Sequence, residues 1–284
     1  MDTERLAVRK TYKLFIAGAF PRSESGRSYE VRDTKGNFLA NAARASRKDV
    51  RDAVAAARKA FGGWSGRTPY NRGQIHYRVA EMMEGRRGQF VDELRADGSG
   101  KAAAETEVNA AIDRWVWYAG WADKIATVTG SANPVAGPFF NFSTPEPTGV
   151  VGIVAPDSAL LGLVSVVAPA VVTGNTCVVV AARPLAAITL AEVLATSDLP
   201  GGVVNILTGD RAELAPWLAS HMDVNAIDLA GAPDELAASC AEAAAENLKR
   251  VLHPAAATDW TADPGTARLT AFLETKTVWH PVGI

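Results

Sequence analysis

Cysteine is scarce in this sequence: among 284 residues only Cys177 and Cys240 occur, and no CxxC or histidine-rich spacing accompanies them. A disulfide framework or a cysteine-based metal site needs several cysteines at short, regular intervals. Cys177 lies in a strand-like apolar run, and Cys240 lies in an alanine-rich helical stretch. We therefore expect two reduced cysteines that serve only the structure.

Long apolar runs and basic runs are also missing. No apolar stretch approaches the ~20 residues that a membrane crossing requires. The first ten residues, MDTERLAVRK, are charged where a secretory signal would be apolar. The formal net charge is −2 and no dense Lys/Arg run occurs, which argues against a nucleic-acid partner. These absences predict a cytoplasmic protein with no membrane and no nucleic acid among its partners.

Several enzyme signatures are absent as well. The sequence has no GxxxxGK[ST] phosphate loop and no GxSxG nucleophile elbow. Its four histidines, His76, His221, His253 and His280, are scattered without a spacing such as HExxH. We expect no metal site, and we interpret these histidines as surface or packing residues.

The stretch from Thr148 to Thr208 carries the clearest pattern in the chain. With 48% hydrophobic and 21% charged residues, the composition is that of a globular protein of one or two domains. Three short β-branched runs, Val150 to Ala155, Thr176 to Val180 and Val203 to Leu207, are separated by two helix-like segments. Unbroken apolar strands alternating with helices are typical of a parallel sheet buried on both faces. The sequence predicts an α/β fold with this unit at its centre.

Helix signals precede the central unit. Ser46 and Asp49 form a capping-box pattern that starts a helix ending at Gly62-Gly63. Thr68-Pro69 starts the next helix, with the hydroxyl as N-cap and proline at the first helical position. A long helix follows from Ala102 to about Ala126.

Other segments read as β structure. Lys13 to Ala19 and Tyr29 to Asp33 flank a turn-like PRSESGRS, which predicts a β-hairpin. The region around Phe139 to Phe142 and the segment Leu273 to Pro281 read as β-arms with little core of their own. Exposed strands with an apolar face must cover something or be covered, so these arms suggest a contact between subunits.

Six segments together, in this order along the chain, resemble the NAD(P)-dependent aldehyde dehydrogenase superfamily. They are YAGWADKI at Tyr118 to Ile125, GVVGIVAP at Gly149 to Pro156, LLGLVSVVAPAVVTGNT at Leu160 to Thr176, LPGGVVNILTG at Leu199 to Gly209, AAAENLKRV at Ala243 to Val251, and the terminal ETKTVWHPVG.

This resemblance implies a Rossmann-like nucleotide-binding domain, here residues 1–127 and 149–254, with a parallel sheet and flanking helices. It also implies a small β oligomerisation arm, here residues 128–148 and 268–284, and a separate catalytic domain with a cysteine nucleophile. The helix from Pro233 to Leu252 and the last strand match the subunit-contact elements of the family.

The sequence departs from the family where the first strand ends. The family continues with Trp-Asn-Phe-Pro, and its asparagine side chain helps to stabilise the oxyanion. Here the continuation is Asp157-Ser158-Ala159, one residue shorter. Loss of one positioned oxyanion donor typically lowers turnover by ~10²–10³. Ser158 could donate a hydrogen bond instead, but a shorter side chain on a shortened loop would have to reach the same point.

A second departure follows the next strand, where the family has Lys-Pro-Ser-Glu for the adenosine ribose and this chain has Val180-Ala181-Ala182-Arg183. Hydrogen bonds that involve charged groups contribute roughly 1.5–3 kcal/mol each, so their loss weakens dinucleotide binding. Arg183 would either meet a phosphate or be solvated.

A third departure affects the phosphate-facing turn, where the family reads Phe-Thr-Gly-Ser before a helix and this chain reads Ala226-Ile227-Asp228-Leu229-Ala230-Gly231-Ala232. Gly231 would still allow close approach of an anion to the helix that follows. Ala232 lacks the serine hydroxyl, and Asp228, Asp234 and Glu235 add negative charge that would repel a pyrophosphate.

The largest departure is the missing catalytic domain. The family continues after AAAENLKRV with Leu-Glu-Leu-Gly-Gly-Lys and a long catalytic domain, whereas the C-terminal strand arrives here almost at once. Even one βαβ unit needs ~30 residues. Cys177 and Cys240 lie in segments where the family has no catalytic residue, so neither inherits the role of the nucleophile.

We therefore interpret the chain as a non-catalytic aldehyde dehydrogenase homologue, a pseudoenzyme that assembles with a full-length aldehyde dehydrogenase or with itself. No catalytic residue is predicted. Arg183, Gly209, Gly231 and Ala232 are the vestiges of a cofactor site, and no cofactor is expected. The alternatives are an NAD(P)-binding oxidoreductase subunit with a rearranged pocket, in which NAD or NADP still binds, and a decaying gene product.

Overall fold

The protein is described by a computed structural model that covers residues 8–253 and 258–283. Its centre is a five-stranded parallel sheet with the strand order β10-β9-β6-β7-β8. In that order the strands are Arg250–Leu252, Ala226–Asp228, Val150–Val154, Thr176–Ala181 and Val204–Thr208. The α/β class with a parallel sheet, expected from the three apolar runs, is confirmed.

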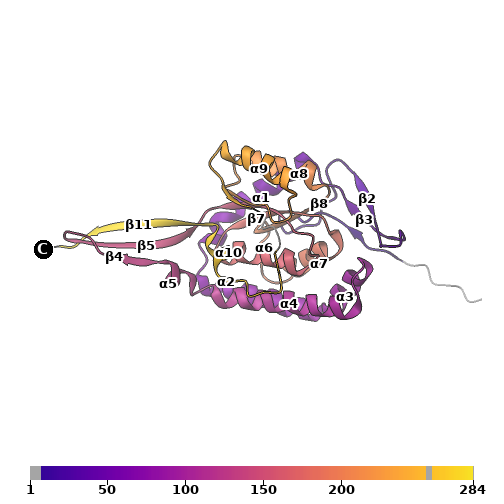
Figure 1. Ribbon diagram of the computed structural model, residues 1–284, viewed down its shortest axis with the longest axis horizontal. Coiled ribbons are helices and arrows are strands. Elements are labelled where there is room, and N and C mark those ends of the chain that lie inside the picture. Colours follow the sequence, from indigo (N-terminus) through magenta and orange to yellow (C-terminus); the bar gives the residue numbers. More distant parts are fainter. Residues whose placement is uncertain (1–7, 254–257, 284) are drawn as a thin grey trace, which may run out of the picture.

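Both faces of the sheet are covered by helices, so the strands are apolar throughout. Val150 and Val154 of β6 face one hydrophobic cluster, while Val151 and Ile153 face another, as the two-residue period of a strand requires. The first cluster lies under α1, α8 and α9, and the second lies under α6 and α7. In Figure 1, α2, α3 and α4 form a further layer outside α6 and α7. The helices in chain order are α1 (Arg47–Ser65), α2 (Pro69–Gly85), α3 (Arg87–Ala96), α4 (Lys101–Trp121), α5 (Ile125–Thr129), α6 (Leu161–Val172), α7 (Pro184–Ala195), α8 (Arg211–Ser220), α9 (Asp234–Ala245) and α10 (Ala267–Thr270).

The N-terminal helix signals act as expected. Ser46 and Asp49 form a complete capping box at the start of α1, and Thr68 caps α2 with a proline at the first position. The expected end of α1 at Gly62-Gly63 was wrong: the helix continues to Ser65 because Trp64 is fully buried and its indole donates to the Val171 carbonyl.

The predicted N-terminal hairpin was wrong in its pairing. Strand β2 (Ser28–Arg32) pairs antiparallel with β3 (Phe38–Ala43), which also pairs with β1 (Thr11–Tyr12). The segment Lys13 to Ala19 instead reaches the outer edge of the main sheet, where Phe15 exchanges two backbone hydrogen bonds with Ile206. An edge strand with free backbone groups provided a partner that local sequence could not indicate.

A long β-arm projects from the body of the molecule (Figure 1). It contains β4 (Ser131–Asn133), β5 (Phe139–Pro147) and β11 (Leu273–Pro281), all antiparallel, with β5 in the middle. Both segments that the sequence assigned to β-arms therefore pair with each other. The predicted domain ranges also include residues 1–7, 254 and 284, which lie outside the described residues.

The C-terminal half of the predicted helix from Pro233 to Leu252 was also wrong. Helix α9 ends at Ala245, Leu248 adopts a positive φ of 57°, and β10 follows as the edge strand of the main sheet. Within the described ranges, no helix combines the length and the apolar character that a membrane crossing demands.

Candidate functional site

The carboxyl edge of the main sheet is the natural place for a ligand. From β6 the chain adds β7 and β8 on one side and β9 and β10 on the other. Open parallel sheets bind ligands where the strand order diverges in this way, outside the carboxyl ends of the strands. The segments that meet at this point are Ala155–Ser158, after β6, and Leu229–Gly231, after β9.

Gly231 closes the crevice between the two segments. Its N–H donates to the Val154 carbonyl at 2.9 Å. A Cβ placed on Gly231 would lie 1.9 Å from the Ala155 carbonyl oxygen, which is far inside van der Waals contact. The close approach that a glycine permits is therefore used for contact between two backbone segments.

Arg211, the first residue of α8, spans the same crevice. Its guanidinium donates to the Gly231 carbonyl at 2.6 Å and pairs with the Asp157 carboxylate at 2.9 Å. The Arg211 side chain is only 20% exposed. It follows the turn at Gly209, where a φ of 146° suits glycine and redirects the chain into α8. Gly209 itself lies against Ala45 and Leu214, and only the Arg211 side chain, which sequence reasoning missed, reaches across to Gly231.

The N-terminus of α6 is already occupied by a carboxylate. Glu107 of α4 accepts hydrogen bonds from the backbone N–H groups of Leu160 and Leu161, at 3.0 and 3.2 Å, and from the Ser158 hydroxyl at 3.1 Å. Ser158 in turn accepts from the Gly162 N–H at 2.9 Å. Free N–H groups at a helix start form a ready anion site, and here a side chain of the same chain fills it. The Ser158 hydroxyl is thereby committed to this cap.

Asp228 at the end of β9 is fully buried and pairs with Arg268 of α10. It also accepts from the Ala230 N–H at 3.0 Å. Burial raises the pKa of this carboxyl group, and the nearby Arg268 opposes the rise. The expectation that Asp228 would add negative charge to the phosphate-facing turn was therefore wrong, because an arginine from the C-terminal segment compensates it.

Residues 258–272, which we call the covering segment, run from this edge of the sheet, where Arg268 meets Asp228, toward the amino edge, where Phe272 meets Thr148. Arg114 of α4 donates to the carbonyls of Trp260 and Ala262, at 2.8 and 3.0 Å, and to the Ser165 hydroxyl at 3.2 Å. The Phe272 carbonyl accepts from the Asn175 side chain and from the Thr148 N–H. The covering segment is thus fastened to α4, α6 and the start of β6.

Two further sequence-predicted positions have partners within the chain. Arg183 occupies the N-cap position of α7 without a side-chain cap hydrogen bond, and its half-exposed guanidinium pairs with Asp97 at 3.0 Å. Ala232 is 7% exposed and packs in the core beneath α9. That α9 begins with Asp234 and Glu235 in its first turn was correctly anticipated.

Neither cysteine is placed for nucleophilic chemistry. Cys177 and Cys240 are both free and both fully buried. Burial raises the pKa of both thiols, that of Cys240 to about 11, whereas a reactive cysteine needs a lowered pKa. Across residues 8–253 and 258–283, no group of three His, Cys, Asp or Glu side chains is arranged to hold a metal ion.

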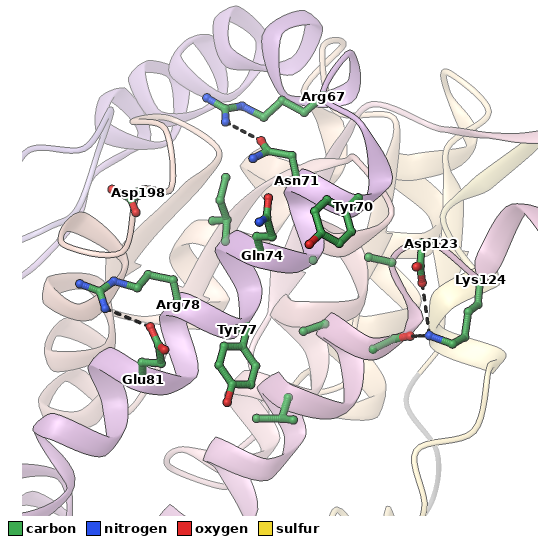
Figure 2. A pocket seen from close by; sticks show the side chains of 16 residues that line it. Arg67, Tyr70, Asn71, Gln74, Tyr77, Arg78, Glu81, Asp123, Lys124 and Asp198 are labelled. Atoms are coloured by element: carbon green, nitrogen blue, oxygen red, sulfur yellow. Dashed lines mark hydrogen bonds and ion pairs between the residues drawn. The ribbon is translucent and has the colours of Figure 1, made fainter.

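A cavity of about 500 Å³ lies next to the Glu107 cap. Its walls come from the first turns of α4, from Ser158 and Leu161, and from Thr258 to Thr261 of the covering segment. A wider groove of about 760 Å³ runs between α2 and the end of α4 (Figure 2). Its side chains include Tyr70 and Tyr77, and Asp198, which precedes β8, places it toward the amino edge of the sheet. The groove is therefore not at the edge where α/β sheets hold their ligands.

The sequence matches known proteins over most of its length. Residues 20–257 match the sequence profile described as the aldehyde dehydrogenase family. The chain belongs to the aldehyde dehydrogenase family. It is 35% identical over 260 residues to DhaS of Bacillus subtilis, covering 88% of this chain and 52% of that protein. It is 33% identical over 246 residues to the aldehyde dehydrogenase of Alternaria alternata, covering 84% of this chain and 49% of that protein.

Solved structures agree with the family assignment and with the fold. This aldehyde dehydrogenase homologue superposes on HpcC of Thermus thermophilus with a TM-score of 0.81 at 31% identity, covering 85% of this chain and 47% of that one. An aldehyde dehydrogenase of Bacillus cereus, solved as an NAD⁺ complex, gives a TM-score of 0.80 at 27% identity, covering 85% of this chain and 50% of that one. The chain thus spans about half the length of DhaS and of the other full-length relatives named here.

Proposed function

We propose that this chain is a non-catalytic aldehyde dehydrogenase homologue that acts as a structural or regulatory subunit through its β-arm. The observation that carries the proposal is that polar groups at the carboxyl edge of the sheet are already paired with side chains of the same chain. Arg211 fills the crevice between β6 and β9, and Glu107 caps α6. A dinucleotide that binds at this edge would compete with these contacts, and any backbone group left buried without a partner costs roughly 1–3 kcal/mol.

The short connection between β10 and β11 supports the same proposal. Only residues 253–272 lie between these two strands, and a βαβ unit needs ~30 residues. The described part of this connection packs on α4 and α6 and supplies Arg268 to Asp228. It thus serves as a cover for the sheet and carries no nucleophile.

The arm offers a surface for assembly. Its exposed side chains include large aromatic groups: Phe139 is 42% exposed, Phe140 is 53% exposed and Trp279 is 58% exposed. The Phe139 and Trp279 rings contact each other edge to face at 5.7 Å. Aromatic residues are enriched in protein interfaces, and the arm exposes several of them. We propose a full-length aldehyde dehydrogenase as the partner, with a second copy of this chain as the alternative.

The assembly can be tested by native mass spectrometry after this chain is co-expressed with the full-length aldehyde dehydrogenases of its source organism. We expect a mixed oligomer that is lost in a Phe140→Ser/Trp279→Ser variant, while the thermal melt of the isolated chain changes little because both side chains are largely exposed. Tyr77→Ser is the matched control, since Tyr77 is 51% exposed and lies on α2, in the groove shown in Figure 2. A chain that stays monomeric with every such enzyme would refute the assembly.

A second candidate function is an NAD(P)-binding oxidoreductase subunit with a rearranged pocket. It is favoured by the likeness to the Bacillus cereus enzyme that was solved with NAD⁺. Calorimetric titration with NAD and with NADP separates the two proposals. We expect no heat of binding at millimolar dinucleotide, and binding in the micromolar range would favour the second candidate.

A further inference from the structure

The cavity beside the Glu107 cap has walls of two kinds. Its polar side chains are Thr106, Glu107, Ser158, Thr258, Asp259 and Thr261. Its apolar side chains are Ala102, Ala103, Ala110, Leu161 and Trp260. A volume of about 500 Å³ lies within the range of small-molecule sites, which combine a mainly apolar wall with a few placed polar groups.

All charge on the cavity wall has one sign. Glu107 and Asp259 are its charged members, and no lysine, arginine or histidine lines it. Within residues 8–253 and 258–283, neither carboxylate forms an ion pair, whereas Arg268 nearby is matched by Asp228. The negative electrostatic potential in such a pocket favours a positively charged ligand and repels an anion such as a dinucleotide.

Both carboxylates are held in place by their own chain. Glu107 accepts all three of its hydrogen bonds at one oxygen, Oε1. Asp259 likewise uses Oδ1, which accepts from the N–H and the hydroxyl of Thr261. The positive end of α6 offsets part of the Glu107 charge, so Asp259 supplies much of the net negative charge. Each carboxylate retains a second oxygen that could accept from a cation.

We propose that this cavity binds a small organic cation with an apolar body, such as an alkyl- or arylammonium ion. The ammonium group pairs with the carboxylates of Glu107 and Asp259. The apolar body lies against Ala103 and Leu161 and beside Trp260, whose ring already has the Arg268 guanidinium 5.2 Å from its centroid, so the charge preference comes from the two carboxylates. The site lies between α4 and the covering segment, so its occupation would stabilise the cover of the sheet. This proposal is independent of the assembly through the arm.

Ligand-observed NMR titration of the whole chain with three probes of similar shape tests the charge preference. We expect saturable binding of benzylammonium, about tenfold weaker binding of benzyl alcohol, and no binding of benzoate. The affinity for benzylammonium should also fall as salt is added. Absence of saturable benzylammonium binding, or equal binding of the three probes, would overturn the proposal.

Three variants locate the site. Asp259→Asn removes a charge but keeps an acceptor for Thr261, and should weaken benzylammonium binding about fivefold to tenfold. Glu107→Gln keeps an amide oxygen for the cap of α6 and should weaken benzylammonium binding by a similar factor. Ala103→Leu should abolish binding by filling the cavity, and leucine is a good helix former at this exposed position of α4.

Asp123→Asn is the matched control, because it removes the same charge in the groove between α2 and α4 (Figure 2). We expect it to leave benzylammonium binding unchanged. An equal loss in the Asp123 variant, or unchanged binding in the Ala103→Leu variant, would place the cation elsewhere and refute the assignment. Circular dichroism and thermal melts of each variant separate loss of binding from loss of folding.

Discussion

Removing Arg268 should destabilise the protein in a way that depends on pH. Asp228 is 0% exposed and pairs with Arg268, whose side chain is 19% exposed. Removing one partner of a buried ion pair leaves an uncompensated charge and typically costs about 3–5 kcal/mol. Arg268→Met keeps most of the side-chain volume, so we expect a loss of about 3 kcal/mol in the free energy of unfolding at pH 8.

The sign of the pH dependence follows from the pKa of Asp228. Burial raises this pKa above its usual value, and Arg268 lowers it, so the variant should raise it further. A carboxyl group whose pKa is higher in the folded state binds a proton more readily there than in the unfolded chain. The penalty of Arg268→Met should therefore be largest at high pH and should shrink as the pH falls through the raised pKa.

Urea unfolding at pH values from 5 to 8 measures this effect, and Arg250→Met is the matched control. Arg250 pairs with Glu274, and the two side chains are 43% and 53% exposed, so its loss should cost less than about 1 kcal/mol. Adding Asp228→Asn to Arg268→Met should restore most of the lost stability. A penalty that stays below about 1 kcal/mol, or that is constant with pH, would refute the reasoning.

Two further predictions concern buried positions. Gly231→Ala should lower the free energy of unfolding, measured by thermal or urea unfolding, by about 3 kcal/mol, because the added Cβ would lie 1.9 Å from the Ala155 carbonyl oxygen. The control Gly120→Ala, on an open helix surface, should be neutral or stabilising. An equal loss in both variants would contradict this explanation. Burial lowers the pKa of His76 to about 4 from 6.5, so the unfolded chain gains a proton first as the pH falls. His76 should therefore cost about 3 kcal/mol of stability between pH 6.5 and 4. His76→Gln should remove that part of the pH dependence while His280→Gln, at an exposed position, should not, and parallel pH profiles for wild type and His76→Gln would refute this prediction.

The fold was predictable from the sequence because its main elements depend on local patterns. The apolar runs that became β6, β7 and β8 were placed within one residue of their observed ends. Capping at Ser46 and Thr68 was equally local. Two of the failures, the pairing of Lys13 to Ala19 and the strand at Arg250–Leu252, involve edges of the main sheet. Edge pairing depends on which backbone groups the rest of the fold leaves free, and no short window of sequence contains that information.

The candidate site was less predictable for the same physical reason. Sequence comparison indicated which loops had changed, but not which side chains would fill the space. Glu107 and Ser158, or Arg211 and Gly231, are far apart in the sequence and meet only after α4 and α8 have packed. A weak local hint existed for Arg211, since an arginine directly after the N-cap of α8 opposes the positive end of the helix. Such a residue needs a nearby acceptor, and the Gly231 carbonyl and Asp157 provide it.

The polar groups at the carboxyl edge of the sheet are satisfied by side chains of the same chain. The N–H groups at the start of α6 and the carbonyls around the crevice need partners whether or not a ligand binds, because unpaired buried backbone groups are costly. Glu107 supplies negative charge at the helix start, where an anion would otherwise be stabilising. Arg211 and Arg268 satisfy the Gly231 carbonyl and Asp228. These polar groups thus have partners from within the chain, and a dinucleotide at this edge would compete against those contacts. On the arm, by contrast, the side chains of Phe140 and Trp279 remain more than half exposed, so this aromatic surface is available to a partner, whereas the polar groups named at the carboxyl edge already have partners within the chain.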